Sequence, residues 1–239
     1  TIIQDINLVN LWKKRKITTF SFIYYLNLLS GRSYNYIHQY IIYPFIINDA
    51  TSSCFCFYDE KYYRKLDQPI PTISNEMLQL AVKKYGDLFE MEPFLFSEIP
   101  SSSLIVSWFL IRAEPFTTIH VSKDQQCHNF PRFDNPDRIF YSVQYLVELL
   151  NGTGFTKEMT PEFFTLPYFL INENNFDLGI RSDNKRVQNV ELPTWSRCCY
   201  SFVSVLRLML ESSISDNLIG KWIDIIFGIK RRVFKYHEK

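Results

Sequence analysis

Hydrophobic side chains recur every three or four residues in several stretches of the chain, which is the pattern of helices that bury one face. In the first of these stretches, Phe20 and Ile23 lie on the apolar face. Thr18 or Thr19 can cap this helix, and Gly31 ends it. By the same signals, helices are expected over residues 18–31, 74–86, 101–112, 135–152, 160–164, 194–212 and 215–228.

Between these helices lie three long segments whose pattern fits neither a helix nor a strand: residues 36–47, 164–178 and 187–195. Each is apolar enough to be buried, yet each is interrupted by proline and by polar side chains. Irregular chain in a core leaves backbone N–H and C=O groups without regular partners. Arg32 and Asn35 stand where the first helix passes into residues 36–47, and they are expected to bond such groups. The fold class predicted from the chain is mostly α, with helices around a core that contains long irregular extended segments.

Composition and charge narrow the classes of function. The chain has 239 residues and a formal net charge of +1, so no overall field favours nucleic acid. Residues 12–16 and 229–239 are locally basic, and weak contact with anionic membranes is one alternative function for them. No run is long and apolar enough to span a bilayer. The chain is expected to be a soluble, cytoplasmic fragment of a longer protein, with reduced thiols because its five cysteines are an odd number.

The chain offers few groups for metal or nucleophilic chemistry. The paired cysteines are too closely spaced for a zinc knuckle: Cys54 with Cys56, and Cys198 with Cys199. Cys127 remains open as a nucleophile with His120 or His38 as its base, although no local motif supports it. The chain contains no Gly-rich phosphate loop, no G-x-S-x-G elbow and no H-E-x-x-H motif. The sequence therefore predicts no metal site and no cofactor.

Several charged residues stand within apolar sequence, where a charge is expected to be paired or hydrogen-bonded inside the fold. These residues are Arg112, Glu114, Asp134, Asp137, Arg138, Glu191, Glu211 and Asp224. A structural network of ion pairs is favoured, because no two of the carboxylates stand in a recognisable catalytic arrangement. The alternative is a catalytic carboxylate base in a hydrolase or transferase.

Seven blocks that contain many of these residues follow one another along the chain: GRSYN, FLIRAEPFT, FDNPDRIF, TPEFFTLPYFLIN, FDLG, VELPTW and WIDIIFGIK. Together they resemble the signature blocks of the BEACH domain, the family named for beige and the Chediak–Higashi regulator. The resemblance extends over residues 12–230, and seven blocks in the same order are a specific signal. It identifies the chain as a divergent member, with residues 1–239 as one BEACH domain and residues 1–11 and 231–239 as linker ends.

The resemblance implies a mostly α fold with unusually irregular core segments. It also implies a preceding PH-like domain that packs against this one and a WD-repeat propeller downstream. Family members are large cytosolic scaffolds of vesicle trafficking, membrane fusion and fission, lysosome size control and autophagy. The function expected from the resemblance is therefore non-enzymatic binding of trafficking partners, at or near endosomal and lysosomal membranes.

The resemblance assigns positions to an interaction or polar framework. Matched to the family's blocks, these positions are Arg32, Tyr34, Asn35, Arg112, Glu114, Asp134, Asp137 and Arg138. The chain departs from the family's pattern at Tyr36, where the family usually has Asp, and at residues 41–45 and 87–91. Each framework residue is expected either at a partner surface or wholly inside the fold.

Overall fold

A computed structural model describes residues 7–73, 75–87, 100–121, 135–152 and 155–228 of the chain. Helices dominate the described part, as predicted, and backbone pairing between extended segments there is limited to isolated bridges. The α-helices are α2 (Leu8–Lys13), α3 (Thr19–Leu29), α4 (Asn75–Asp87), α5 (Ser103–Phe109), α6 (Phe116–Val121), α7 (Val143–Asn151), α8 (Glu162–Thr165), α9 (Cys199–Leu210) and α10 (Ser213–Ile226). Short 3-10 turns are η1 (Ile37–Gln39), η2 (Glu60–Tyr62), η3 (Ile70–Thr72), η4 (Pro136–Arg138) and η5 (Pro167–Leu170).

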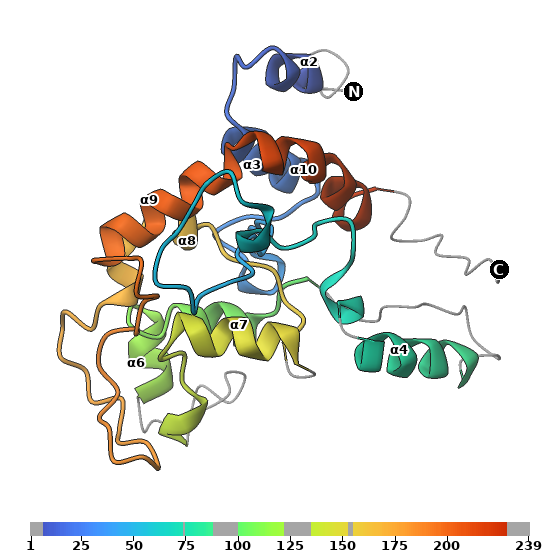
Figure 1. The fold of residues 1–239 in the computed structure, drawn as a ribbon. Coiled ribbons are helices and arrows are strands. Elements are labelled where there is room, and N and C mark those ends of the chain that lie inside the picture. Colours follow the sequence, from blue (N-terminus) through green and yellow to red (C-terminus); the bar gives the residue numbers. More distant parts are fainter. Residues whose placement is uncertain (1–6, 74, 88–99, 122–134, 153–154, 229–239) are drawn as a thin grey trace.

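Irregular chain fills the centre of the molecule. Figure 1 shows α9 and α10 along one side and α7 along the other, with the light-blue chain that follows α3 between them. Residues 40–47 of that chain are all buried. Tyr43 is held by two backbone hydrogen bonds with Met159, of 2.8 and 3.0 Å. Ile47 lies opposite Tyr63 in a second antiparallel bridge, in which the hydrogen bonds join the neighbouring residues instead. The expectation of buried, irregular chain over residues 36–47 is therefore confirmed for its larger part.

Aromatic side chains make much of the core around these segments. Phe109 meets Phe140 and Phe163 edge to face, with ring centroids 5.5 and 4.8 Å apart. Trp222 on α10 is 1% exposed and lies on the buried face of the last helix. Edge-to-face pairs add to the free energy gained by burial, so these contacts fix the helices on the irregular centre.

Several predicted helix boundaries are wrong, by as much as seven residues at the start of α7. Asn135 does not cap the long helix, because its side chain accepts from the Asp137 N–H at the start of η4. The chain is then extended through Phe140, and Ser142 caps α7 instead. The extended stretch forms a bridge between Ser142 and Glu191, a pairing that the local pattern cannot show.

The C-terminal helices also differ from the prediction at their ends. Helix α9 begins at Cys199, because residues 194–198 form turns after Pro193. Ser212 caps α10, whereas the predicted cap, Ser215, is fully buried and donates to the Met209 C=O. Helices α2 and α6 were not predicted, since each has only six residues and shows too little periodicity.

Candidate functional site

Two side chains hold the irregular chain where it leaves α3. Buried Arg32 donates from Nη1 to the Tyr40 C=O over 3.0 Å. Fully buried Asn27 donates from Nδ2 to the Ile42 C=O at 2.9 Å and accepts from the Ile42 N–H at 3.0 Å. The contact expected of Arg32 is thus present, but Asn27 makes the two-way bond that a strand partner would otherwise supply. Asn27 was missed, although an Asn four residues after Ile23 on an apolar helix face could have indicated it.

The remaining residues of the GRSYN block lie at the surface. Tyr34 is 46% exposed and packs edge to face on Tyr40, with ring centroids 5.6 Å apart. Asn35 is exposed beside it. Tyr34 also lies against Tyr24 of α3, with ring centroids 6.2 Å apart. We group it with the exposed side chains of α3 and the following loop and call this set the tyrosine face: Tyr25, Leu28, Leu29, Tyr34 and Tyr36. Arg32 is the one charged residue between positions 17 and 48, and it is buried, so this face is uncharged.

Arg112 and Glu114, neighbours in one signature block, have separate roles. Arg112 is 3% exposed and donates to two backbone carbonyls, from Nε to Gln188 at 2.7 Å and from Nη1 to Phe140 at 2.6 Å. Burial lowers the pKa of its guanidinium. Glu114 is exposed and accepts from the Thr118 hydroxyl at 2.8 Å. Arg112 therefore joins two irregular segments inside the fold, whereas Glu114 faces solvent.

The third block ties down a surface loop. The Asp137 carboxylate accepts from the backbone N–H and the hydroxyl of Ser182, at 3.0 and 2.9 Å. These bonds lower the pKa of Asp137. Arg138 is exposed, and its C=O accepts from Trp108 Nε1 at 2.6 Å. Asp134 lies outside the described residues.

A buried ion pair that the sequence did not indicate lies in the core. Arg64 and Glu158 are 2% and 4% exposed, and their Nη2 and Oε1 atoms are 3.1 Å apart. Trp222 Nε1 donates to Oε1 at 3.0 Å, and the Phe45 N–H donates to Oε2. Arg64 in turn donates from Nε to the Phe45 C=O. We call these four residues the Glu158 junction; in it, one carboxylate receives donors from three separate parts of the chain.

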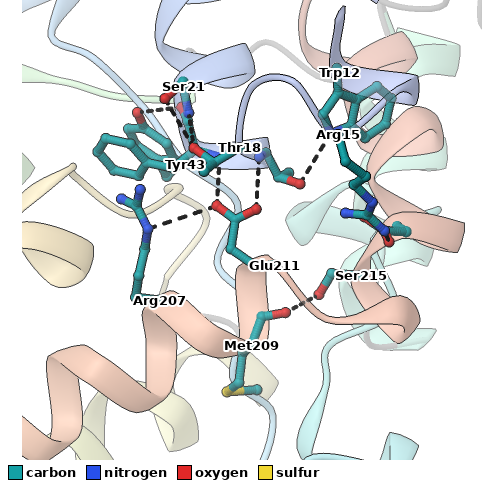
Figure 2. Close-up of polar contacts among 12 residues, drawn as sticks. Trp12, Arg15, Thr18, Ser21, Tyr43, Arg207, Met209, Glu211 and Ser215 are labelled. Carbon is teal, nitrogen blue, oxygen red and sulfur yellow. Dashed lines mark hydrogen bonds and ion pairs between the residues drawn. The ribbon is translucent and has the colours of Figure 1, made fainter.

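Two further carboxylates act within the fold. Glu162 on α8 is buried, and burial raises its pKa, although the Tyr40 hydroxyl donates to its Oε1 at 2.8 Å. Glu211, at the end of α9, accepts from the first backbone N–H groups of α3, at Thr19 (2.8 Å) and Phe20 (3.0 Å). Figure 2 shows its carboxylate between this first turn of α3 and the guanidinium of Arg207.

The described residues bring together no metal-binding group of three or more histidine, cysteine or acidic side chains. Cys54, Cys56 and Cys198 are exposed free thiols, and Cys199 is buried. Cys127, the nucleophile considered above, lies outside the described residues. In the part of the chain that the structure describes, no helix has the length and apolar character needed to cross a bilayer.

Comparison with known proteins agrees with the signature blocks. A family model, the Beige/BEACH domain, matches residues 10–238. The BEACH domain-containing protein lvsD of Dictyostelium discoideum is 38% identical over 97% of this chain, which spans 8% of that protein. The lysosomal-trafficking regulator of Homo sapiens is 35% identical over 94% of the chain, which spans 6% of it, and the BEACH domain-containing protein B of Arabidopsis thaliana is 33% identical over 92%, spanning 8%. The chain thus spans less than a tenth of the length of these relatives, and it belongs to the Beige/BEACH domain family.

Proposed function

We propose that this domain is a non-enzymatic binding module of a large protein of membrane and vesicle trafficking. It packs against a PH-like domain encoded upstream, and the pair presents a surface to trafficking proteins, with a WD-repeat propeller further downstream. It works in the cytoplasm, at the surface of endosomal or lysosomal membranes. Support for this role comes from membership of the BEACH family and from a relative named as a lysosomal-trafficking regulator.

The observation that carries the proposal is that residues of the GRSYN block lie in two different environments, one inside the fold and one at the surface. Arg32 turns inward and binds backbone, whereas Tyr34 and Asn35 remain outside on an uncharged face. Interface centres are depleted in charged residues and enriched in tyrosine. The tyrosine face has this composition, and buried Asn27 and Arg32 hold the chain beneath it in one conformation. A preorganised surface loses less entropy when it binds.

The carboxylates considered for catalysis have structural partners that suit a binding module. Asp137 fixes the loop at Ser182, and Glu114 bonds Thr118 within its own helix turn. Exposed Glu191 has a carboxylate oxygen 4.0 Å from Arg181, whose guanidinium also stacks over a tyrosine ring. These contacts give each carboxylate a role in holding the fold.

A calorimetric titration of the chain with the segment encoded immediately upstream tests the proposal. We expect a dissociation constant in the micromolar range or tighter, about −8 kcal/mol. Tyr34→Arg should weaken this binding at least about tenfold, because it places a charge at the centre of an apolar interface. Tyr58→Arg is the matched control, since Tyr58 is 89% exposed and lies outside the tyrosine face. Absence of binding by two folded partners would overturn the packing proposal.

A further inference from the structure

A groove of about 730 Å³ lies between residues 60–73 and the first turns of α10. Its apolar lining includes Ile73, Ile214 and Leu218, which are partly buried and pack on the main core. Its polar lining includes the amide side chains of Gln68 and Asn217. The volume falls within the range of ligand-binding clefts, so the groove is large enough to take a segment of another molecule. In Figure 1 the teal chain of residues 60–73 passes below α10.

One wall of this groove includes a short extended segment, residues 63–65, that follows η2 and has an unused backbone edge. Tyr63 bridges Ile47, and the flanking bonds run from the Arg64 N–H to the Ile46 C=O and from the Asn48 N–H to the Tyr62 C=O. Alternate backbone groups of a strand point to opposite sides. The Tyr63 C=O and the Lys65 N–H therefore point away from residues 46–48. Within the described part of the chain, neither of these two groups forms a hydrogen bond.

Side chains of this extended segment and of the residue after it are anchored in the core. Arg64 is anchored in the Glu158 junction, and Leu66 is 1% exposed in the core. Tyr63, Arg64 and Lys65 all line the groove. A short extended segment with a free C=O and a free N–H two residues apart matches the geometry by which extended peptides add to a sheet edge.

The charged residues along this wall indicate which charges a molecule bound in the groove would have. Lys61 and Lys221 already have acidic partners, with each Nζ 3.4 Å from a carboxylate oxygen, of Asp59 and Asp67 respectively. Lys65 and Glu60 are exposed, and neither forms an ion pair in the part of the chain described here. A complementary occupant therefore has an acidic side chain near Lys65 and a basic one near Glu60.

We propose that this groove binds a short extended peptide of another protein, which adds as a strand along residues 63–65. Its backbone pairs with the Tyr63 C=O and the Lys65 N–H. Its apolar side chains, at alternate positions, lie on Ile214 and Leu218, and its terminal charges face Lys65 and Glu60. This site uses none of the tyrosine face, so it does not depend on the function proposed above.

The test uses an array of synthetic peptides of about six to eight residues. Ile or Val alternates with Ser or Thr in each, and Asp and Lys occupy the two ends in either order. Binding to the 239-residue chain is measured by fluorescence polarisation. We expect one charge order to bind better than the other. Methylation of the pairing backbone nitrogens of the best peptide should then weaken binding about tenfold or more, since its side chains are unchanged while its hydrogen bonds are lost.

The matched protein variants are Lys65→Pro and Lys65→Arg. Lys65→Pro removes the backbone N–H and should weaken binding about tenfold or more, whereas Lys65→Arg keeps both the N–H and the charge and should bind as the parent does. Thermal unfolding checks that each variant is folded. The N-methylated peptides test the same bond without any change to the protein. The proposal is overturned if no peptide binds more tightly than about 1 mM, or if the methylated and unmethylated peptides bind equally well.

Discussion

At the scale of single residues, Asn27 and Arg32 show how side chains replace the regular partners of buried backbone. The Asn27 amide both donates to and accepts from Ile42, as a neighbouring strand would. Arg32 supplies a donor to the Tyr40 C=O two residues earlier. Because an unpaired buried polar group costs about 1–3 kcal/mol, the fold depends on these side chains rather than on a sheet at this point.

Arg32→Ala should therefore destabilise the chain. The variant leaves the Tyr40 C=O without this donor, and it removes the packing of a buried side chain. We expect the free energy of unfolding to fall by about 1–3 kcal/mol or more, measured by urea denaturation. Arg197→Ala, at an exposed position, should change it by no more than about 0.5 kcal/mol. Equal stability of the two variants would show that Arg32 does not clamp the chain.

Buried Glu162 should make the free energy of unfolding depend on pH. Burial raises its pKa in the folded chain above the unfolded value of about 4.3. As pH rises, the unfolded chain loses this proton first, so stability falls from the unfolded pKa through the folded pKa and stays lower at pH 7. Glu162→Gln cannot ionise. Relative to the parent, its stability in urea unfolding should rise between pH 4 and pH 7. Glu173→Gln, at an exposed position, should show no such gain, and a flat difference for Glu162→Gln would refute the assignment.

At the scale of elements, the start of α3 is stabilised by a side chain from a helix near the other end of the sequence. Its first turn leaves backbone N–H groups unbonded, and the Glu211 carboxylate of α9 accepts two of them (Figure 2). A negative charge at a helix N-terminus also interacts favourably with the helix dipole. The order of α3 therefore depends on the docking of α9, about 190 residues later.

Glu211→Ala should loosen the start of α3. We expect a loss of about 1–3 kcal/mol in the free energy of unfolding, because two N–H groups lose a charged acceptor. Amide hydrogen exchange at Thr19 and Phe20 should become faster, while exchange in α7 should not change. Glu148→Ala is the control, since Glu148 is an exposed helix residue bonded to Gln144. Unchanged exchange at Thr19 would contradict the capping role.

Helices with a long apolar stripe could be predicted from the sequence, and their ends only in part. Helices α3, α7, α9 and α10 overlap the stretches where the pattern predicts them. Of the two caps that the sequence allows for α3, Thr18 and Thr19, the structure uses Thr18, whose side chain accepts from the Ser21 N–H. Asn135 and Ser215 were assigned wrongly, because their side chains are used by η4 and by the buried Met209 C=O. Both contacts are local, two and six residues apart in the sequence, but the periodicity of apolar side chains does not report which backbone group a polar side chain bonds.

The roles of the buried polar residues could likewise be predicted only in part. The role of Arg32 followed from its place between a helix and irregular chain. Arg64 and Glu158 stand in the stretches YYRKLD and TKEMT, which read as ordinary exposed charge. Their burial follows from a pairing across 94 residues, and no local pattern carries that information. Glu211 was recognised as a charge within apolar sequence, but its partner helix could not be named.

At the scale of the whole molecule, the Glu158 junction joins parts that otherwise share no regular secondary structure. Trp222 belongs to α10, Phe45 to the central irregular chain and Arg64 to the wall of the groove. A buried ion pair of this kind gives little net stability compared with a hydrophobic replacement. Removal of one partner is costly, however, because a charge then remains buried alone. The junction should therefore act in specifying how the three parts meet.

A double-mutant cycle on Arg64 and Glu158 tests this account of the junction. Glu158→Gln or Arg64→Met alone leaves one buried charge without its counter-ion, and each should lower the free energy of unfolding by about 3–5 kcal/mol in urea denaturation. The double variant removes both charges, so its loss should be well below the sum of the two single losses, by about 1–3 kcal/mol or more. Lys61 and Asp59 form an exposed ion pair, and the same cycle on Lys61→Met and Asp59→Asn should give a coupling of no more than about 1 kcal/mol. Additive losses at Arg64 and Glu158 would mean that the two charges do not depend on one another, and that Trp222 and Phe45 hold the three parts together through packing alone.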